Sequence, residues 1–391
     1  MSYFLLIVFL FSLFVPICSY ILFPLYLKLS TKKSLISKNT YDSVINWPPV
    51  TIVFSVFNEE KVIKRKLESI LNSDYPKDKI RIVIGSDHST DLTNSIIESY
   101  QLLCPQITLL KKNTRSGKLK IINELVDLTE TDYLIFTDAN VFFEQLTIKA
   151  LVYNLLSKNA QMVCGNIHKF SPQNNGISGQ EIFYMNFENQ LKYWESLKYG
   201  FCMGVEGGCY AIVKPCFVKV PDGFLMDDFF ITLDVISKHG KVLFEPEAIC
   251  YEDVNDAPLI EFKRKIRISL GNFRNLKFYK HLLFPIHKGL GFVFFCHKVL
   301  RWITPFAMIV SFISSLWLMV YCPFFVTVSL GYCFFFLLPI ITILLEKVNL
   351  KLPLVNTIGH FILMNFALLI GYFKFISASH ESAWEPPKRN V

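Results

Sequence analysis

Long uncharged apolar segments restrict most strongly how this chain can fold. Residues 3–27, YFLLIVFLFSLFVPICSYILFPLYL, contain no charged side chain. At about 1.5 Å per residue, a helix of that length crosses a hydrocarbon core of about 30 Å. A cleaved signal peptide has a shorter apolar core and a small-residue cleavage site, and neither is clear here. We therefore expect residues 1–28 to form a retained transmembrane anchor, with a signal peptide as the alternative.

The C-terminal third contains three further segments of this kind. Each has the length and composition of a membrane span, and the one Lys among them, Lys374, lies near an end where its stem can snorkel. The segments are residues 303–321, 323–345 and 353–376. We expect three transmembrane helices over 302–376 and a tail at 377–391.

The stretch before these spans, residues 281–301, combines a long apolar surface with His287, Lys288, Lys298 and Arg301. It also contains residues that argue against one continuous span, namely Pro285, Gly289 and Gly291. We expect an amphipathic segment that lies on the membrane surface.

The basic residues predict the orientation. The first apolar segment is followed by Lys28, Lys32, Lys33 and Lys38. The positive-inside rule therefore places the large domain, residues 48–280, in the cytoplasm of a multi-pass plasma-membrane protein. Four spans would return the C-terminus to the outside, although the tail contains the basic stretch EPPKRN. The side of the tail stays open.

The region between the apolar ends alternates strands with helices. Four buried-strand patterns, VTIVFSVF, IRIVIGSD, ITLLKK and YLIFTD, are separated by helical patterns. Asn58 is expected to cap the first of these helices. The order βαβαβαβ predicts an α/β fold with a mostly parallel sheet, whose ligands bind at the carboxyl ends of the strands.

Charged and polar residues gather at those strand ends. Asp87 ends the second strand, and Asp138 and Asn140 follow the fourth. Lys118 opens a helix after the loop NTRSGK and suits a diphosphate. Because clustered carboxylates repel one another, we expect a divalent cation, Mg²⁺ or Mn²⁺, on a phosphorylated ligand. The alternative for Asp87 and Asp138 is an ordinary turn.

The segments FSVFNEE, SDHSTD, NTRSGK and TDAN resemble glycosyltransferase family 2, whose members have a Rossmann-like GT-A fold. FLMDDF at 224–229 is similar to the family's acidic base motif. RKIR at 264–267 and HKVLRWITPF at 297–306 resemble segments of membrane-bound polysaccharide synthases. The resemblance covers residues 48–320.

The resemblance implies roles for individual residues. Asp87 would contact the nucleotide base, here uracil, and Asp138 the sugar nucleotide, with Asp138 and Asn140 binding the metal. Asn140 stands where the family has a carboxylate, which predicts weaker metal binding. Phe57 would stack on the base or pack in the core, and Glu59 would contact the nucleotide or merely start a helix.

Asp228 would be the catalytic base, with Asp227 as the second candidate; helix-start charge is the alternative for both. Arg264 and Arg267 share a helix face and would hold the diphosphate, or else contact anionic lipid. Ile268 replaces the Trp of processive synthases.

The glycines of the segment 204–208 predict a close approach of backbone to the sugar or acceptor. Glu206, in the same segment, receives no role.

These observations predict a membrane-bound inverting enzyme that transfers sugar from a UDP-sugar to a lipid-linked or glycan acceptor in envelope polysaccharide assembly. The alternatives are a processive polysaccharide synthase and a catalytically inert sugar-nucleotide-binding subunit of an export complex. The net charge of +8 fits a domain held against anionic lipid. The sequence shows no stretch of interleaved basic and aromatic residues that would indicate nucleic-acid binding.

Overall fold

The computed structural model describes residues 2–31, 41, 44–170, 177–253, 258–347 and 352–377. Lys32, Lys33 and Lys38, which carry part of the predicted orientation, and the tail beyond Ser377 lie outside these ranges. The chain divides into two compact units. The sheet unit comprises Thr31–Pro172, Ile182–Asn255 and His380–Val391. The helical unit comprises Met1–Ser30, Gln173–Glu181 and Asp256–Ser379.

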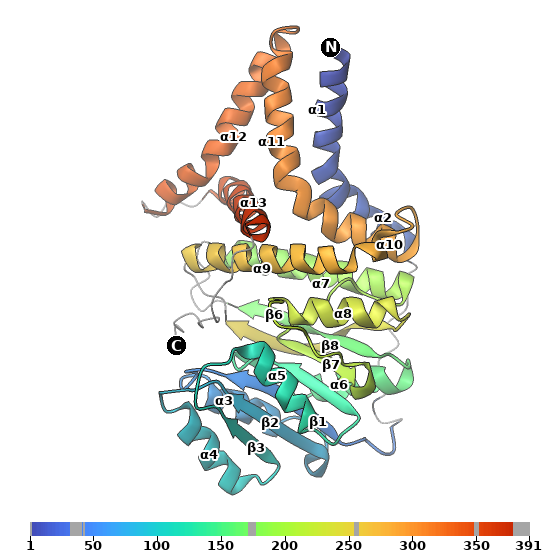
Figure 1. Ribbon diagram of the computed structural model, residues 1–391, viewed down its shortest axis with the longest axis vertical. Helices are drawn as coiled ribbons and strands as arrows, with labels where there is room; N and C mark the ends of the chain where they lie inside the picture. Colours follow the sequence, from blue (N-terminus) through green and yellow to red (C-terminus); the bar gives the residue numbers. More distant parts are fainter. Residues whose placement is uncertain are drawn as a thin grey trace. The chain divides into compact units, whose positions relative to one another are not determined.

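Four parallel strands form the first half of the sheet, as the sequence predicted (Figure 1). They lie in the order β3-β2-β1-β4. Their bounds are Val50–Val56 for β1, Ile80–Ser86 for β2, Ile107–Lys111 for β3 and Tyr133–Thr137 for β4. Because these strands are parallel, their carboxyl ends lie at one edge of the sheet, which is the edge where the predicted site residues follow.

The second half of the sheet is largely antiparallel, so the whole sheet is mixed. The order continues β7-β6-β8-β5 beyond β4. β7 (Cys209–Val213) runs antiparallel to β4 and to β6 (Met162–Phe170). β8 (Val242–Asp253) is parallel to β6 and antiparallel to β5 (Val141–Phe143). The predicted α/β class is confirmed.

Helices cover both faces of the parallel half. α3 (Ile63–Leu71), α4 (Thr93–Leu103) and α6 (Thr147–Ser157) bury their apolar faces in one core with alternate residues of β1 and β2. α5 (Lys118–Asp127) packs on the opposite face, where Gly85 leaves room. A Cβ at Gly85 would collide with Ile121 of α5. The remaining helices associated with the sheet are α7 (Ile177–Tyr199) and α8 (Asp227–Ser237), with short 3₁₀ turns at Lys77–Lys79 and Lys214–Cys216.

The expected cap at Asn58 is wrong. α3 begins at Ile63, and Asn58 has φ of 51°, in the left-handed region. Its Oδ1 accepts the backbone N–H of Thr90 at 2.9 Å and so ties the loop after β1 to the loop after β2. Because the Asn58 side chain accepts a hydrogen bond from a neighbouring loop, it does not cap the N-terminus of α3.

The helical unit contains four helices long and apolar enough to cross a membrane, which makes it a membrane-associated unit. The candidate spans are Tyr3–Ser30, Gly289–Leu318, Phe324–Leu345 and Pro353–Ile376. The first is built from α1 (Ser2–Ile17), a π-helical turn at Cys18–Leu22 and α2 (Phe23–Ser30). The last two lie in α12 (Phe324–Lys347) and α13 (Pro353–Ile376).

Two predicted boundaries need correction. The surface segment 281–301 was expected to be separate from the next span, but α10 (Gly289–Val293), a π-helical stretch at Phe294–Val299 and α11 (Leu300–Leu318) are joined in one helix. Gly291 permits this helix start, because a Cβ there would meet the carbonyl groups of Leu283 and Pro285. A 3₁₀ turn at Lys280–Leu283 precedes it.

The second correction concerns α9 (Pro258–Tyr279), which was expected to belong to the soluble domain. It groups with the helical unit, because it packs on α13. Phe273 of α9 contacts Tyr372 edge-to-face, with ring centroids 4.9 Å apart.

Candidate active site

Lys118 and Asp138 meet at the carboxyl edge of the parallel strands. Lys118 is the first residue of α5, and Asp138 follows β4 directly. Lys118 Nζ donates to Asp138 Oδ1 at 2.7 Å. Burial lowers the pKa of Lys118, but Asp138 and Asp227 raise it to a net value above the usual one. The ammonium therefore stays charged at a helix N-terminus, where an anion is favoured.

Asp87 organises the loop that delivers Lys118. Its carboxylate is buried and accepts the backbone N–H groups of Ser116 at 2.6 Å and Gly117 at 3.0 Å. Arg115 Nε donates to the same carboxylate at 3.1 Å. The structure thus places Asp87 where the sequence predicted it, but its oxygens hold protein groups. The nucleotide contact stays a prediction.

Phe57 and Glu59 lie in the loop after β1. The guanidinium of Arg115 stands over the Phe57 ring, 3.4 Å from its centroid. Glu59 is buried, and its backbone N–H donates to Thr93 Oγ1 at 2.8 Å. Both residues are therefore part of the joined loops beside Asp87. In the second of these loops His88 has φ of 62°, a conformation that favours glycine.

The predicted metal ligands supply a partial set of oxygen donors. Asn140 is buried, and its Nδ2 donates to Glu252 Oε1 at 3.4 Å, which leaves its Oδ1 free of that contact. Among the described residues, no three His, Cys, Asp or Glu side chains are grouped to hold an ion. Asp138 and Asn140 fit Mg²⁺ or Mn²⁺ only if a diphosphate and water complete the shell, as they commonly do.

Asp228 has the geometry of a base with a tuned pKa. It lies in the first turn of α8 and is 8% exposed. Its Oδ2 accepts the N–H of Gly207 at 2.9 Å, and its Oδ1 accepts the N–H of Phe229 at 2.7 Å. Burial, with Asp227 and Glu206 nearby, raises the pKa of Asp228 to about 7. Each oxygen keeps a second lone pair for a substrate hydroxyl.

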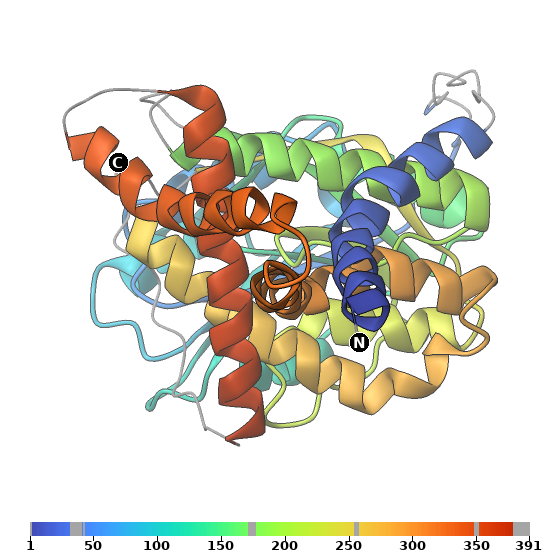
Figure 2. The ribbon, with the colours of Figure 1, turned by 90° about the horizontal axis from the view of Figure 1, so that it is seen from above.

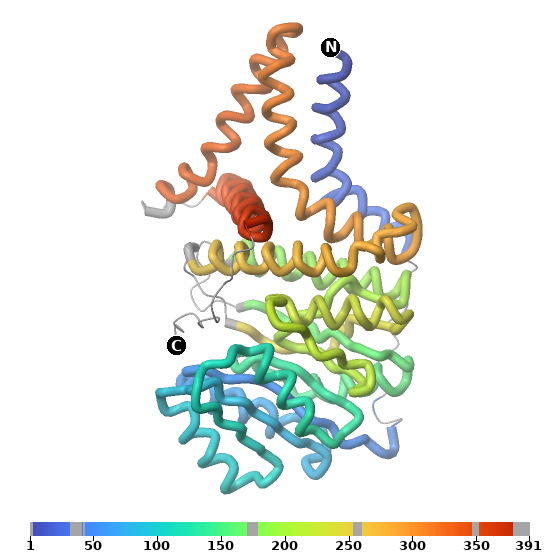
Figure 3. Tube along the Cα trace, in the orientation of Figure 1, coloured from blue at the N-terminus to red at the C-terminus, as the bar shows by residue number. Residues whose placement is uncertain are grey.

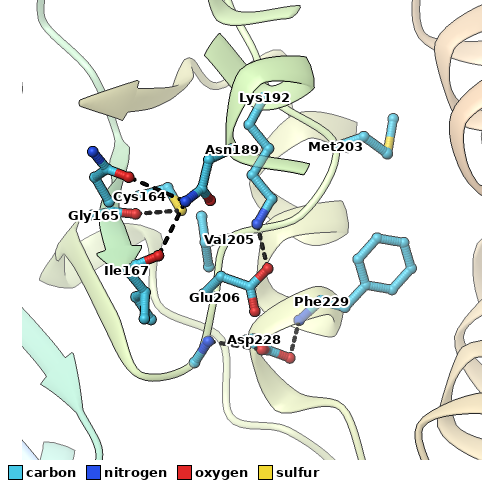
Figure 4. Close-up of polar contacts among 12 residues, drawn as sticks. Cys164, Gly165, Ile167, Asn189, Lys192, Met203, Val205, Glu206, Asp228 and Phe229 are labelled. Carbon is cyan, nitrogen blue, oxygen red and sulfur yellow. Dashed lines mark hydrogen bonds and ion pairs between the residues drawn. The ribbon is translucent and has the colours of Figure 1, made fainter. Parts of the chain in front are cut away.

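Glu206 and Lys192, which the sequence analysis left without roles, lie next to this base. In Figure 4 Glu206 stands between Lys192 of α7 and Asp228. Lys192 is almost completely buried and forms an ion pair with Glu206. Burial lowers the pKa of Lys192, but Glu206 raises it to a net value above the usual one. The signal in the sequence was a lone Lys in a helix of mixed polarity, which is too common to notice.

The glycines beside Glu206 make room for protein rather than for a ligand. A Cβ at Gly207 would lie 3.0 Å from Asp228 Oδ2. A Cβ at Gly208 would lie 2.9 Å from Val141 Cγ2. These protein contacts by themselves require glycine, and the approach of backbone to the sugar or acceptor stays a prediction.

The rise in the Asp228 pKa predicts a pH dependence. A base acts in its ionised form, so transfer is expected to increase as pH rises through about 7. Removing the Glu206 charge lowers the pKa of Asp228, so the double variant Lys192→Met/Glu206→Gln should move this limb to lower pH. Changing both partners avoids a lone buried cation. Initial rates between pH 5 and 9 measure the shift. If the transfer rate of the double variant rises over the same pH range as that of the unmodified chain, Glu206 does not have this role.

Lys66 is a further residue that the sequence analysis missed. It lies on α3, is fully buried, and donates to Thr137 Oγ1 at 2.8 Å and to the carbonyl of Val141. Its Nζ stands 3.8 Å from the centroid of the Phe143 ring. Burial lowers the pKa of Lys66 to about 7. Its two acceptors flank Asp138 and Asn140, so Lys66 holds both ends of the segment that carries them.

Lys66→Met is therefore expected to weaken metal-dependent nucleotide binding by about 10- to 100-fold, the usual effect of losing a group that orients metal ligands. Lys64→Met is the matched control, because Lys64 lies exposed on the same helix. Isothermal titration with Mn²⁺ and UDP, together with thermal unfolding, separates binding from stability. Equal affinities in the two variants would show that Lys66 has no such role.

Arg264 and Arg267 lie on α9 and therefore in the helical unit. Arg264 Nη1 donates to Glu261 Oε2 at 3.1 Å. Their predicted contact with the diphosphate stays a prediction.

Part of the chain matches a known protein family. Residues 51–210, which contain Asp87, Lys118 and Asp138, match the family model "Glycosyl transferase family 2". The chain carries a glycosyltransferase family 2 domain. One relative is "Probable glycosyltransferase YdaM" of Bacillus subtilis (strain 168). It is 24% identical over a stretch that covers 58% of this chain and 55% of the relative's length.

A second relative of this glycosyltransferase domain is in Methanococcus voltae. It is "Dolichyl N-acetyl-alpha-D-glucosaminyl phosphate 3-beta-D-2,3-diacetamido-2,3-dideoxy-beta-D-glucuronosyltransferase", 24% identical over 51% of this chain and 65% of its own. The chain thus spans between half and two thirds of the length of these two relatives.

The GT-A-like fold of the family 2 domain is also found among solved structures. The mannosyltransferase PcManGT from Pyrobaculum calidifontis, in complex with GDP-Man and Mn²⁺, aligns with a TM-score of 0.70 and 17% identity. The alignment covers 95% of this chain and 100% of PcManGT. The expected GT-A fold is confirmed.

Proposed function

We propose that this chain is an inverting glycosyltransferase that moves a sugar from a nucleotide diphosphate sugar, specifically a UDP-sugar, to a lipid-linked or glycan acceptor at the membrane. The observation that carries the proposal is the pairing of Lys118 with Asp138 at the strand edge, with Asp227 and Asp228 close enough to shift the pKa of the same lysine. A cationic group for the leaving diphosphate and a base for the acceptor thus belong to one site.

In this reaction Asp228 accepts the proton of the acceptor hydroxyl as its oxygen bonds to the anomeric carbon. The bond from that carbon to the diphosphate breaks on the opposite side, so the anomeric configuration inverts. Lys118 and the N-terminus of α5 neutralise the charge of the departing diphosphate. A divalent cation held by Asp138 and Asn140 would add positive charge at the same oxygens.

The membrane setting supports an acceptor that is lipid-linked or a growing glycan. The helical unit carries four helices of membrane-spanning length and composition. A glycosyltransferase relative in Methanococcus voltae is named for a dolichyl-phosphate-linked sugar acceptor. The basic residues after the first span favour a catalytic domain on the cytoplasmic side of the plasma membrane. We place the reaction in envelope polysaccharide assembly.

The proposal is tested with the full chain in membranes. Release of the nucleotide diphosphate is measured with a panel of UDP- and GDP-sugars, with lipid extract as acceptor source. Sugar-dependent release with one UDP-sugar supports the proposal. Binding of a donor without transfer to any acceptor fraction would favour the alternative, an inert sugar-nucleotide-binding subunit.

A related prediction concerns product length. Ile268 occupies the position of the aromatic residue of processive synthases, so we expect one added sugar or a very short extension. Gel analysis of radiolabelled product from the purified protein measures this. A ladder of high-mass polymer would instead establish the alternative, a processive polysaccharide synthase.

A further inference from the structure

The last apolar helix, α13, runs crosswise to its neighbours within the helical unit. Figure 1 shows α1 and α11 upright and α13 end-on, and Figure 2 shows the reverse. By length and composition α13 could cross a membrane, with 24 residues and a mean hydropathy of 1.7. Its direction separates it from the helices that composition alone groups with it.

Contacts along α13 hold both of its halves against polar helices. His360 Nε2 lies 3.4 Å from Glu181 Oε1 in the first turns of α7. Further along, Ser269 Oγ of α9 donates to the carbonyl of Leu368 at 2.7 Å. Gly371 lies so close to Ser269 that a Cβ would collide with it.

From His360 to Gly371 these contacts span about 16 Å of helix, at about 1.5 Å per residue. That is about half of a hydrocarbon core of about 30 Å. A helix that crossed the membrane would contact the polar head-group layer only near its two ends, and not over this length.

The helix that α13 packs on cannot lie in hydrocarbon. α9 carries charged residues along its whole length, which are Glu261, Lys263, Arg264, Lys265, Arg267, Arg274 and Lys277. Lys265 Nζ lies 3.9 Å from Glu181 Oε1, so the partner of His360 is itself part of this charged layer. Because charges at the bilayer centre cost several kcal/mol each, α9 belongs at head-group depth, and α13 rests on it.

The two faces of α13 differ as a surface helix requires. The side turned toward α7 and α9 carries His360 and the buried Gly371, which lie about three turns apart on one face of the helix. The side turned away exposes apolar residues on successive turns, which are Phe366, Ile370, Phe373 and Ile376. An apolar face of this kind inserts shallowly at the boundary between head groups and acyl chains.

We propose that α13 lies in the membrane surface, with this apolar face against the acyl chains of one leaflet, and does not cross the bilayer. The chain then crosses three times. Figure 3 traces it down α1, up α11 and down α12, which returns it to the level of α13. The C-terminus leaves the membrane on the same side as α9.

This arrangement removes the conflict between the number of membrane crossings and the positions of the basic residues. With four crossings the tail, which contains Lys388 and Arg389, would lie on the side opposite the basic residues that follow the first span. With three crossings both basic segments lie on one side, as the positive-inside rule expects.

The test locates the C-terminus of the full chain without relying on catalysis. A protease-cleavable epitope tag is placed after Val391. Two reference tags are inserted singly, one at Ile45 on the domain side and one at Cys322 in the exposed turn between α11 and α12. Sealed spheroplasts are treated with protease and then with detergent.

We expect the Val391 tag to behave like the Ile45 tag, both being protected until detergent is added or both being cut together. Behaviour like the Cys322 tag would mean that α13 crosses the bilayer, and the proposal would be wrong. As an independent measurement, a green fluorescent protein fused after Val391 should fluoresce in a bacterial host when the Ile45 tag is cytoplasmic, and alkaline phosphatase at the same site should be inactive. The opposite pair of results would also overturn the proposal.

Discussion

Asp228→Asn is expected to slow sugar transfer by roughly 100-fold or more while leaving nucleotide affinity nearly unchanged, because a positioned base contributes about that factor. The carboxylate of Asp228 is buried, and burial raises its pKa to about 7, close to the pH at which a base is most effective. An amide has nearly the same shape but takes up no proton. Initial rates and isothermal titration with UDP measure the two effects separately.

The structure sets the controls for this experiment. Both oxygens of Asp228 accept backbone N–H groups, so the amide leaves one of them without its acceptor, at a cost of about 1–3 kcal/mol in stability. Thermal unfolding must therefore accompany the rates. Asp222→Asn is the matched control, because its side chain is exposed on the preceding loop. Should Asp227→Asn abolish transfer while Asp228→Asn does not, the base is Asp227.

Asp138→Ala is expected to lower the affinity for UDP at least tenfold in the presence of Mn²⁺, which corresponds to about 1.4 kcal/mol. The change removes the carboxylate that pairs with Lys118 at 2.7 Å and that we expect to hold the metal. The remaining donor, Asn140, is a neutral oxygen and a weaker ligand. Titration of UDP with Mn²⁺, with Mg²⁺ and with a chelator measures the effect.

Asp132→Ala is the control for this variant, because Asp132 is exposed at the opposite end of β4. It should bind UDP as the unmodified chain does. If the unmodified chain binds UDP equally well in chelator and in Mn²⁺, Asp138 and Asn140 have no metal role. The proposal would then depend on Lys118 and the start of α5 alone.

Much of the site could be predicted from sequence because it follows regular strands. A buried strand is a short apolar run, and the polar residue that ends it lies at the sheet edge whatever the surrounding packing. Asp87 and Asp138 were located in this way, and the order of strands and helices brought them to one edge with Lys118. The same local patterns identified the apolar segments of the helical unit.

The supporting residues could not be predicted, because they act across long sequence separations. Lys66 reaches Thr137, 71 residues away, and Lys192 pairs with Glu206 from a different element. A Lys in an amphipathic helix is ordinarily a solvated side chain, and no local pattern distinguishes the few that are buried. Asn58 failed as a predicted cap for a similar reason, since its partner Thr90 lies 32 residues away in another loop.

The sequence by itself determined the α/β class, the strand-end carboxylates and the apolar segments, because each depends on residues that are neighbours along the chain. The tertiary structure decided which groups surround Asp228, and hence the direction in which its pKa moves, because burial and charge come from distant residues. It also decided the direction of α13. Hydropathy measures the composition of a helix, but its orientation follows from the charged helix α9 on which it packs.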